Sequence, residues 1–166
     1  MSSIEQLADQ YGLFLCVECG KCVAVCPMGE IYTHVSYEAS PRGIIERILL
    51  DPGIPEDDSL WFCLTCDLCT DLCPAGVRFR DFVEAIRQVA MKTGITEYSS
   101  FCDSCGTYLY PQHILEYLKQ ALGEPAEKLL TLCTRCRRYH FGIKLKAQMP
   151  GKRKVGSPKV QIGNSR

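Results

Sequence analysis

Two short segments of the chain carry cysteines at the same intervals. Both read C-x2-C-x2-C-x3-C-P, the first over residues 16–27 and the second over residues 63–74. A single C-x2-C pair occurs in many kinds of site, whereas two four-cysteine runs that agree at every interval and both end in proline are typical of iron-sulfur proteins. The spacing therefore predicts two 4Fe-4S clusters held by cysteine thiolates.

The spacing also predicts which cysteines share a cluster. Three cysteines at two-residue intervals let one loop wrap three corners of a cube, while the fourth lies too far along its own segment and, as in two-cluster ferredoxins, ligates the other cluster. The expected ligands are Cys16, Cys19, Cys22 and Cys73 for the first cluster, and Cys63, Cys66, Cys69 and Cys26 for the second. A disulfide framework or a pair of zinc sites is the alternative.

The other four cysteines form two C-x2-C pairs, Cys102 with Cys105 and Cys133 with Cys136, which enclose 27 residues. Two such knuckles can place four sulfurs at the corners of a tetrahedron, and we predict a structural zinc ion there, because four thiolates leave no open position. A third iron-sulfur cluster, a rubredoxin-like iron, a redox-active dithiol and a site that includes His140 remain alternatives. We otherwise expect the histidines to be ordinary surface residues.

Composition limits the class of protein. The 166 residues suffice for one domain or two small ones, and the 19 Lys and Arg balance the 19 Asp and Glu, although residues 151–166 hold five basic and no acidic residues. No secretory signal is recognisable, and no apolar run approaches the roughly 18 residues that span a bilayer. Metal-binding cysteines fit a reducing compartment, so we expect a cytoplasmic protein without direct membrane insertion.

Apolar periodicity and capping residues predict helices around the cysteine runs. We expect helices over residues 4–11, from Pro41 to about residue 50 after a Ser40 cap, over about 75–92 and over 111–122. Several apolar residues flank the first cysteines and are expected to keep water off the first cluster; they are Leu13, Phe14, Leu15, Val17, Val23 and Val25.

Two such cysteine runs, each leading into a helix and separated by a helical insertion, resemble the alpha-helical ferredoxin domain. This domain occurs in the iron-sulfur subunits of succinate dehydrogenase, fumarate reductase and glycolate oxidase and in the C-type subunit of heterodisulfide reductase, and the last group is the most similar. The resemblance covers about residues 4–93. We therefore expect a mainly α fold with an alpha-helical ferredoxin-like domain (1–95), a small zinc-ribbon-like metal-binding lobe (96–149) and a basic, disordered tail (150–166).

The resemblance implies an electron-transfer protein without catalytic residues of its own. It would relay electrons between a heterodisulfide reductase A-like flavoprotein and a B-like catalytic partner. Alternatives are the iron-sulfur component of a flavin-linked 2-hydroxy-acid or glycerol-phosphate dehydrogenase, and an iron-sulfur and zinc DNA-binding regulator. We expect no nucleic-acid partner, because neither interleaved aromatics nor a helix-turn-helix pattern accompany the basic residues.

The two runs differ in charge. The first has Gly20 and Lys21 where the second has Asp67 and Leu68, and Asp71 adds an acid near the second run. Positive charge favours the reduced form of a cluster, so we expect the higher reduction potential at the first cluster.

Overall fold

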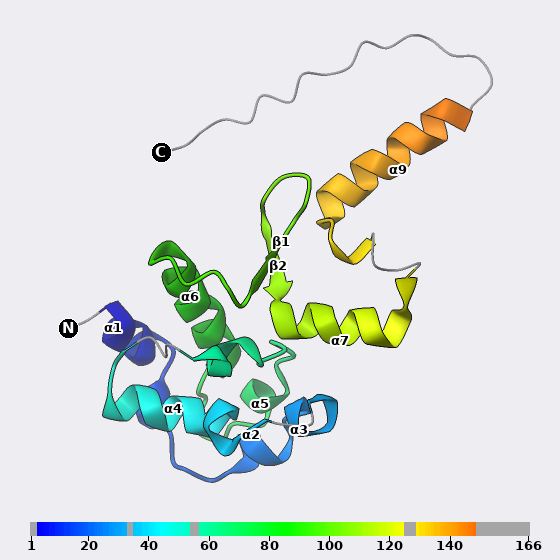
Figure 1. The fold of residues 1–166 in the computed structure, drawn as a ribbon. Coiled ribbons are helices and arrows are strands. Elements are labelled where there is room, and N and C mark those ends of the chain that lie inside the picture. Colours follow the sequence, from blue (N-terminus) through cyan, green and yellow to red (C-terminus); the bar gives the residue numbers. More distant parts are fainter. Residues whose placement is uncertain (1–2, 33–34, 54–56, 125–128, 149–166) are drawn as a thin grey trace.

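The computed structural model describes residues 3–32, 35–53, 57–124 and 129–148, so the expected basic tail lies outside the described residues. Helices dominate these ranges, and the strands among them form one antiparallel pair. Figure 1 shows helices α1 to α6 gathered at one end of the molecule, a hairpin and α7 beside them, and α9 projecting away. The expected mainly α fold class is confirmed.

The cysteine-rich end is built from short helices. They are α1 (Ser3–Gln10), α2 (Lys21–Ala24), α3 (Met28–Ile31), α4 (Pro41–Leu50), α5 (Leu68–Asp71) and α6 (Phe79–Lys92). The expected helices over 4–11 and from Pro41 are confirmed. The helix expected from about residue 75 begins four residues later, because Gly76 adopts a left-handed φ of 69° and the N–H of Val77 donates to Sγ of Cys73.

Helix α4 begins at a side-chain cap. Oγ of Ser40 accepts a hydrogen bond of 3.1 Å from the N–H of Gly43, and Pro41 occupies the first helical position, where its missing N–H costs nothing. A Cβ at Gly43 would lie 2.3 Å from the carbonyl oxygen of Tyr37, so only glycine allows the preceding 3-10 turn to pack this closely. The helix buries Ile44, Ile45 and Ile48 against the core.

The centre of the core lies between α6 and the segment that precedes the second cysteine run. Trp61, Phe82 and Ile86 are fully buried there. Arg87 is also buried, and its guanidinium donates to the carbonyl oxygens of Leu60 (3.0 Å from Nε) and Cys63 (2.7 Å from Nη2). Because these bonds compensate the desolvation of Arg87, the buried cation can link α6 to the first cysteine of the second run.

The apolar residues beside Cys16 are not all buried, although burial is expected of residues that keep water off the first cluster. Leu13 is buried, but Phe14, Leu15 and Val17 are 54%, 61% and 64% exposed. Leu13–Leu15 form a 3-10 turn, in which successive side chains point in directions about 120° apart. Of the turn residues only Leu13 reaches the core, so the expectation was wrong for Phe14 and Leu15, whereas the exposed Val17 lines a cavity among the cysteines.

The C-terminal part contains β1 (Ser99–Phe101), β2 (Tyr108–Pro111), α7 (Gln112–Leu122) and α9 (Thr134–Gln148). The helix expected over 111–122 is confirmed, while the hairpin and α9 were not foreseen. Tyr98 and Tyr108 lie with their ring centroids 6.3 and 6.4 Å from Trp61, so the hairpin packs on the core of the cysteine-rich end. In the described ranges, no helix has the length and apolar character needed to cross a membrane.

The histidine of α7 joins the same junction. The ring of His113 stacks on Phe62 with centroids 4.1 Å apart, and its Nε2 lies 3.1 Å from Oδ2 of Asp58. The expectation of an ordinary surface histidine was wrong for His113. His140 is exposed, and His34 lies outside the described residues.

We predict that shortening a buried residue of α4 destabilises the fold far more than shortening an exposed one. Ile48 is 1% exposed and Leu50 is 82% exposed. Ile48→Ala should cost about 2–5 kcal/mol through lost burial and a residual cavity, whereas Leu50→Ala should stay within about 0.5 kcal/mol. Thermal unfolding of anaerobic, metal-loaded protein would measure both, and equal effects would contradict the described packing of α4.

Candidate metal centres

The two cysteine loops share one backbone conformation. The third residue of each run has a positive φ, 56° at Glu18 and 53° at Thr65, and so does the fifth, 73° at Gly20 and 72° at Asp67. Left-handed residues between the cysteines curl the chain, and α2 and α5 begin directly after them. The repeated cysteine spacing is thus matched by a repeated structure, even where the intervening residues differ.

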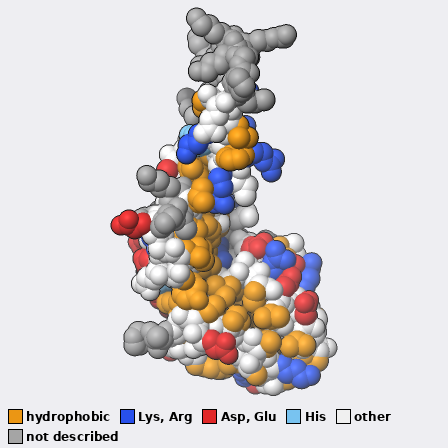
Figure 2. Space-filling view, turned by 90° about the vertical axis from the view of Figure 1, so that its right-hand side faces the viewer, with side chains coloured by type: hydrophobic (Ala, Val, Ile, Leu, Met, Phe, Trp, Pro, Cys, Tyr) orange, Lys and Arg blue, Asp and Glu red, His pale blue; other side chains and the backbone are white. Residues whose placement is uncertain are grey.

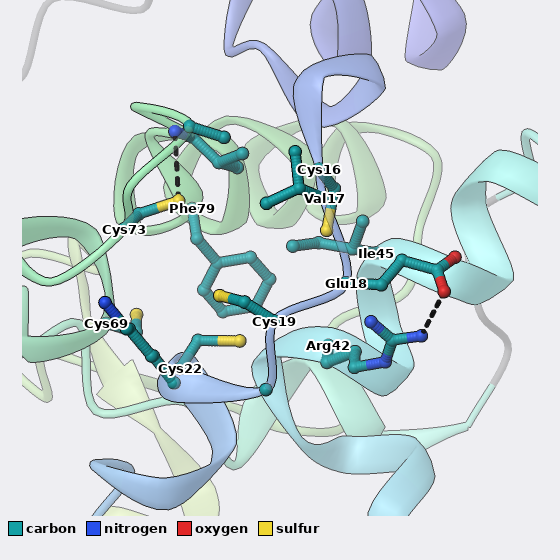
Figure 3. Close-up of a pocket in the computed structure, with 14 residues that line it drawn as sticks. Cys16, Val17, Glu18, Cys19, Cys22, Arg42, Ile45, Cys69, Cys73 and Phe79 are labelled. Carbon is teal, nitrogen blue, oxygen red and sulfur yellow. Dashed lines mark hydrogen bonds and ion pairs between the residues drawn. The ribbon is translucent and has the colours of Figure 1, made fainter.

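The first cavity lies beside the first cysteine run. The cysteines around it are Cys16, Cys19, Cys22, Cys69 and Cys73. Figure 3 shows their side chains together with Val17, Ile45 and Phe79, which add apolar walls, and Arg42 at one side. Cys73 comes from the second run and therefore lies with three cysteines of the first.

A second cavity adjoins the first. Its cysteines are Cys26, Cys63, Cys66 and Cys69, and Met28, Pro41, Leu64 and Arg80 are among its other walls. Cys26 comes from the first run, so each run places its fourth cysteine at the cavity of the other. This is the placement that the crossed ligand assignment requires, while ligation by these eight cysteines stays a prediction.

The walls of both cavities fit iron-sulfur clusters, which supply one-electron redox chemistry when bound. The donors are thiols in apolar surroundings, and backbone N–H groups of Thr65 and Val77 lie 3.4 Å from Sγ of Cys63 and Cys73 as hydrogen-bond donors to sulfur. Burial raises the pKa of the Cys22, Cys26 and Cys63 thiols, and it raises that of Cys69 to about 12. A bound metal must therefore displace these protons.

The third cysteine group converges on one point. The sulfur atoms of Cys102, Cys105, Cys133 and Cys136 all lie within 4.8 Å of one another, and those of Cys105 and Cys133 are 3.7 Å apart. Hydrogen bonds bend both knuckles: the N–H of Gly106 donates to the carbonyl of Cys102 (2.8 Å), and that of Cys136 donates to Sγ of Cys133 (3.4 Å). A chain that folds in this way can present four thiolates to one ion.

Ionisation of these four cysteines is uneven. The N–H of Cys133 donates to Sγ of Cys102 at 3.3 Å and lowers the pKa of that thiol to about 6. A contact with Ser104 lowers the pKa of Cys136, but the neighbouring Cys105 and Cys133 sulfurs outweigh it and raise the pKa to about 12. All four become thiolates together only if a cation compensates their charge.

Three arginines near the cavities were not singled out from the sequence. Arg42 and Arg80 line the first and second cavities, and Arg87 binds the carbonyl of Cys63. Arg42 is the second residue of α4 and Arg80 is the second residue of α6, and these matching positions could have drawn attention to them. Nothing in a single sequence, however, shows which loop such a helix start faces.

Comparison with known proteins agrees with this geometry. Residues 11–77 match the family model described as the 4Fe-4S dicluster domain. No curated protein and no solved structure matches the chain. The match covers both cysteine runs and supports an iron-sulfur, ferredoxin-like protein with a role in electron transfer.

We predict that the fourth cysteine of the second run behaves as part of the first centre. Cys73→Ser and Cys19→Ser should each lower the iron content from about eight to about four atoms per chain, and the cluster that remains should give the same EPR spectrum in both variants. Cys66→Ser should leave the other cluster with a different spectrum. If the spectrum of Cys73→Ser matched that of Cys66→Ser instead, the ligands would not be crossed.

Proposed function

We propose that the chain is the electron-transfer component of a heterodisulfide reductase-like complex, in which it relays single electrons through two 4Fe-4S clusters. One observation carries the proposal: the two sulfur-lined cavities share Cys69 as a common wall. Centres this close suit electron transfer from one to the other. Partners would be an A-like flavoprotein and a B-like protein that performs disulfide or sulfur-compound redox chemistry.

The role assigned to this chain is to hold the clusters and control their surroundings. With Cys69 assigned to the second cluster, four cysteines remain for each cubic cluster, which completes its coordination and leaves no position for a substrate. Apolar residues such as Ile45, Phe79 and Met28 limit the water around the sulfurs. Catalysis is therefore assigned to a partner.

The charge distribution supports a partner protein with an acidic surface. Residues 1–127 hold 8 Lys and Arg against 19 Asp and Glu, whereas residues 128–166 hold 11 Lys and Arg and no acid. Helix α9 belongs to the basic part, and it has no buried residue. Figure 2 shows apolar and basic side chains next to each other on the projecting part of the molecule.

A groove beside α9 fits an acidic segment with apolar anchors. Its apolar walls include Leu129, Leu132 and Phe141, and its charged residues are Arg137, Arg138, Lys144 and Asp103, with the positive charges in excess. Phe141 is 61% exposed. Because the aliphatic Leu129 and Leu132 accompany the cations, we assign the groove to a protein segment of a partner.

The third cysteine group is best explained by one zinc ion. A zinc ion with Zn–S bonds of about 2.3 Å separates its four sulfurs by about 3.8 Å, and the Cys105 and Cys133 sulfurs lie 3.7 Å apart. An iron-sulfur cube binds each cysteine through a different iron and needs sulfurs spread more widely. The ion would connect the hairpin to the start of α9.

Metal analysis tests this assignment. Anaerobically purified protein should contain about eight irons and about one zinc per chain, and Cys105→Ser should remove the zinc while leaving the iron content and visible absorption unchanged. About twelve irons per chain without zinc would instead indicate a third 4Fe-4S cluster at this site. A ninth iron in place of zinc would indicate a rubredoxin-like site.

Co-purification under native conditions tests the complex. We expect a flavoprotein together with a protein of disulfide chemistry, and we expect Arg138→Glu with Lys144→Glu to lose them, because both residues line the groove. The matched control is Arg135→Glu with Lys146→Glu, which makes the same charge change at residues of α9 that do not line the groove and should retain the partners. A hydroxy-acid or glycerol-phosphate flavoprotein, or bound nucleic acid, would contradict the proposed complex.

A further inference from the structure

Two arginines occupy corresponding places beside the two cavities. Arg42 is the second residue of α4 and lines the first cavity, and Arg80 is the second residue of α6 and lines the second cavity. Each forms an ion pair with the cysteine loop it faces. Nη2 of Arg42 lies 3.0 Å from Oε2 of Glu18, and Nη1 of Arg80 lies 3.0 Å from Oδ2 of Asp67.

Each guanidinium keeps one buried nitrogen that has no hydrogen-bond partner in the described part of the chain. These atoms are Nη1 of Arg42 and Nε of Arg80. Nε of Arg80 also forms an ion pair with Oε1 of Glu84 at 3.4 Å. Figure 3 shows one nitrogen of Arg42 on Glu18 and another turned toward the side where the cysteines gather. A buried donor without an acceptor is costly, and Nη1 of Arg42 therefore points to an acceptor within the first cavity.

Arg42 has a second partner and is less exposed to solvent than Arg80. Nε of Arg42 donates to Oη of Tyr37 at 2.8 Å, and Tyr37 in turn donates to Glu46 at 3.3 Å. The side chain of Arg42 is 18% exposed, whereas that of Arg80 is 40% exposed. Solvent therefore screens the charge of Arg80 more strongly.

We propose that Arg42 and Arg80 each set the reduction potential of the cluster in their own cavity, by placing a fixed positive charge and an N–H donor against it. This inference rests on the two clusters of the proposed function. Reduction adds one negative charge, which a nearby cation stabilises, so both arginines raise the potential. Glu18 holds Arg42 in place, Asp67 and Glu84 hold Arg80, and these carboxylates offset part of the positive charge.

Anaerobic redox titration followed by EPR tests the proposal. At a fixed ambient potential, Arg42→Gln should lower the ratio of reduced to oxidised form of one cluster about tenfold, which corresponds to about 59 mV for one electron. Arg80→Gln should lower the ratio for the other cluster by a smaller factor, because Arg80 is more exposed. Arg42→Lys should restore most of the loss, since it keeps the charge.

A second variant separates an electrostatic role from a structural one. Glu18→Gln breaks the same ion pair as Arg42→Gln but removes a negative charge instead of a positive one. If Arg42 acts by its charge, Glu18→Gln raises the potential that Arg42→Gln lowers. If Arg42 only braces the loop, both variants shift the potential in the same direction, and the proposal is overturned.

Arg47 provides a control on the same helix. It pairs with Asp57 at 2.7 Å and lines neither cavity, so Arg47→Gln should leave both potentials unchanged. An unchanged potential in Arg42→Gln, or shifts of the same cluster in Arg42→Gln and Arg80→Gln, would overturn the inference while leaving the two clusters intact. Wild-type protein without two titrating clusters would overturn the proposed function as well.

Discussion

The cysteine-rich end depends on one requirement: sulfur atoms from two distant segments must meet at the same two points. Each run lines its own cavity with three cysteines and the other cavity with its fourth, and Cys69 of the second run lines both. Such an exchange works only if both runs are fixed to a common frame. The buried face of α6, the fully buried Trp61 and the hydrogen bonds from Arg87 to Leu60 and Cys63 provide that frame beside the second run.

The starts of α4 and α6 lie between the cavities and contact both. Pro41 lines the second cavity and Arg42 the first, while Phe79 lines the first and Arg80 the second. Two consecutive residues of each helix thus face different cavities, one with an apolar ring and one with a cation. This arrangement repeats the exchange of the fourth cysteines. The negative charges of Glu18 and Asp67 in the two loops are also offset, because both carboxylates form ion pairs with these arginines.

The C-terminal lobe is joined to the segment that leads into the second run. Trp61 contacts the tyrosines at the hairpin, and Phe62 stacks on His113 of α7, just before Cys63. The third cysteine group then links the hairpin to α9 through sulfurs that lie within 4.8 Å. The basic helix is therefore attached to the rest of the molecule through cysteine knuckles rather than through a large apolar core, since α9 buries none of its residues.

The sequence by itself determined the features that depend on local geometry. Cysteine spacing predicted the two repeated loops, Ser40 and Pro41 predicted the start of α4, and the apolar stripes of α1, α4 and α6 predicted helices. These signals work because spacing, capping and periodicity act within a few residues of one another. The hairpin gave no such signal, because its strands have only three and four residues, and α9 gave none because its apolar residues do not follow one face.

Only the tertiary structure decided which side chains face the cavities and which face water. Phe14 and Leu15 are apolar and precede Cys16, yet they are exposed. The contacts of Arg42 with Glu18 and of His113 with Phe62 join residues that are far apart in the chain. Such contacts depend on how elements pack in three dimensions, and the order of residues along one chain does not specify that packing at the level of single side chains.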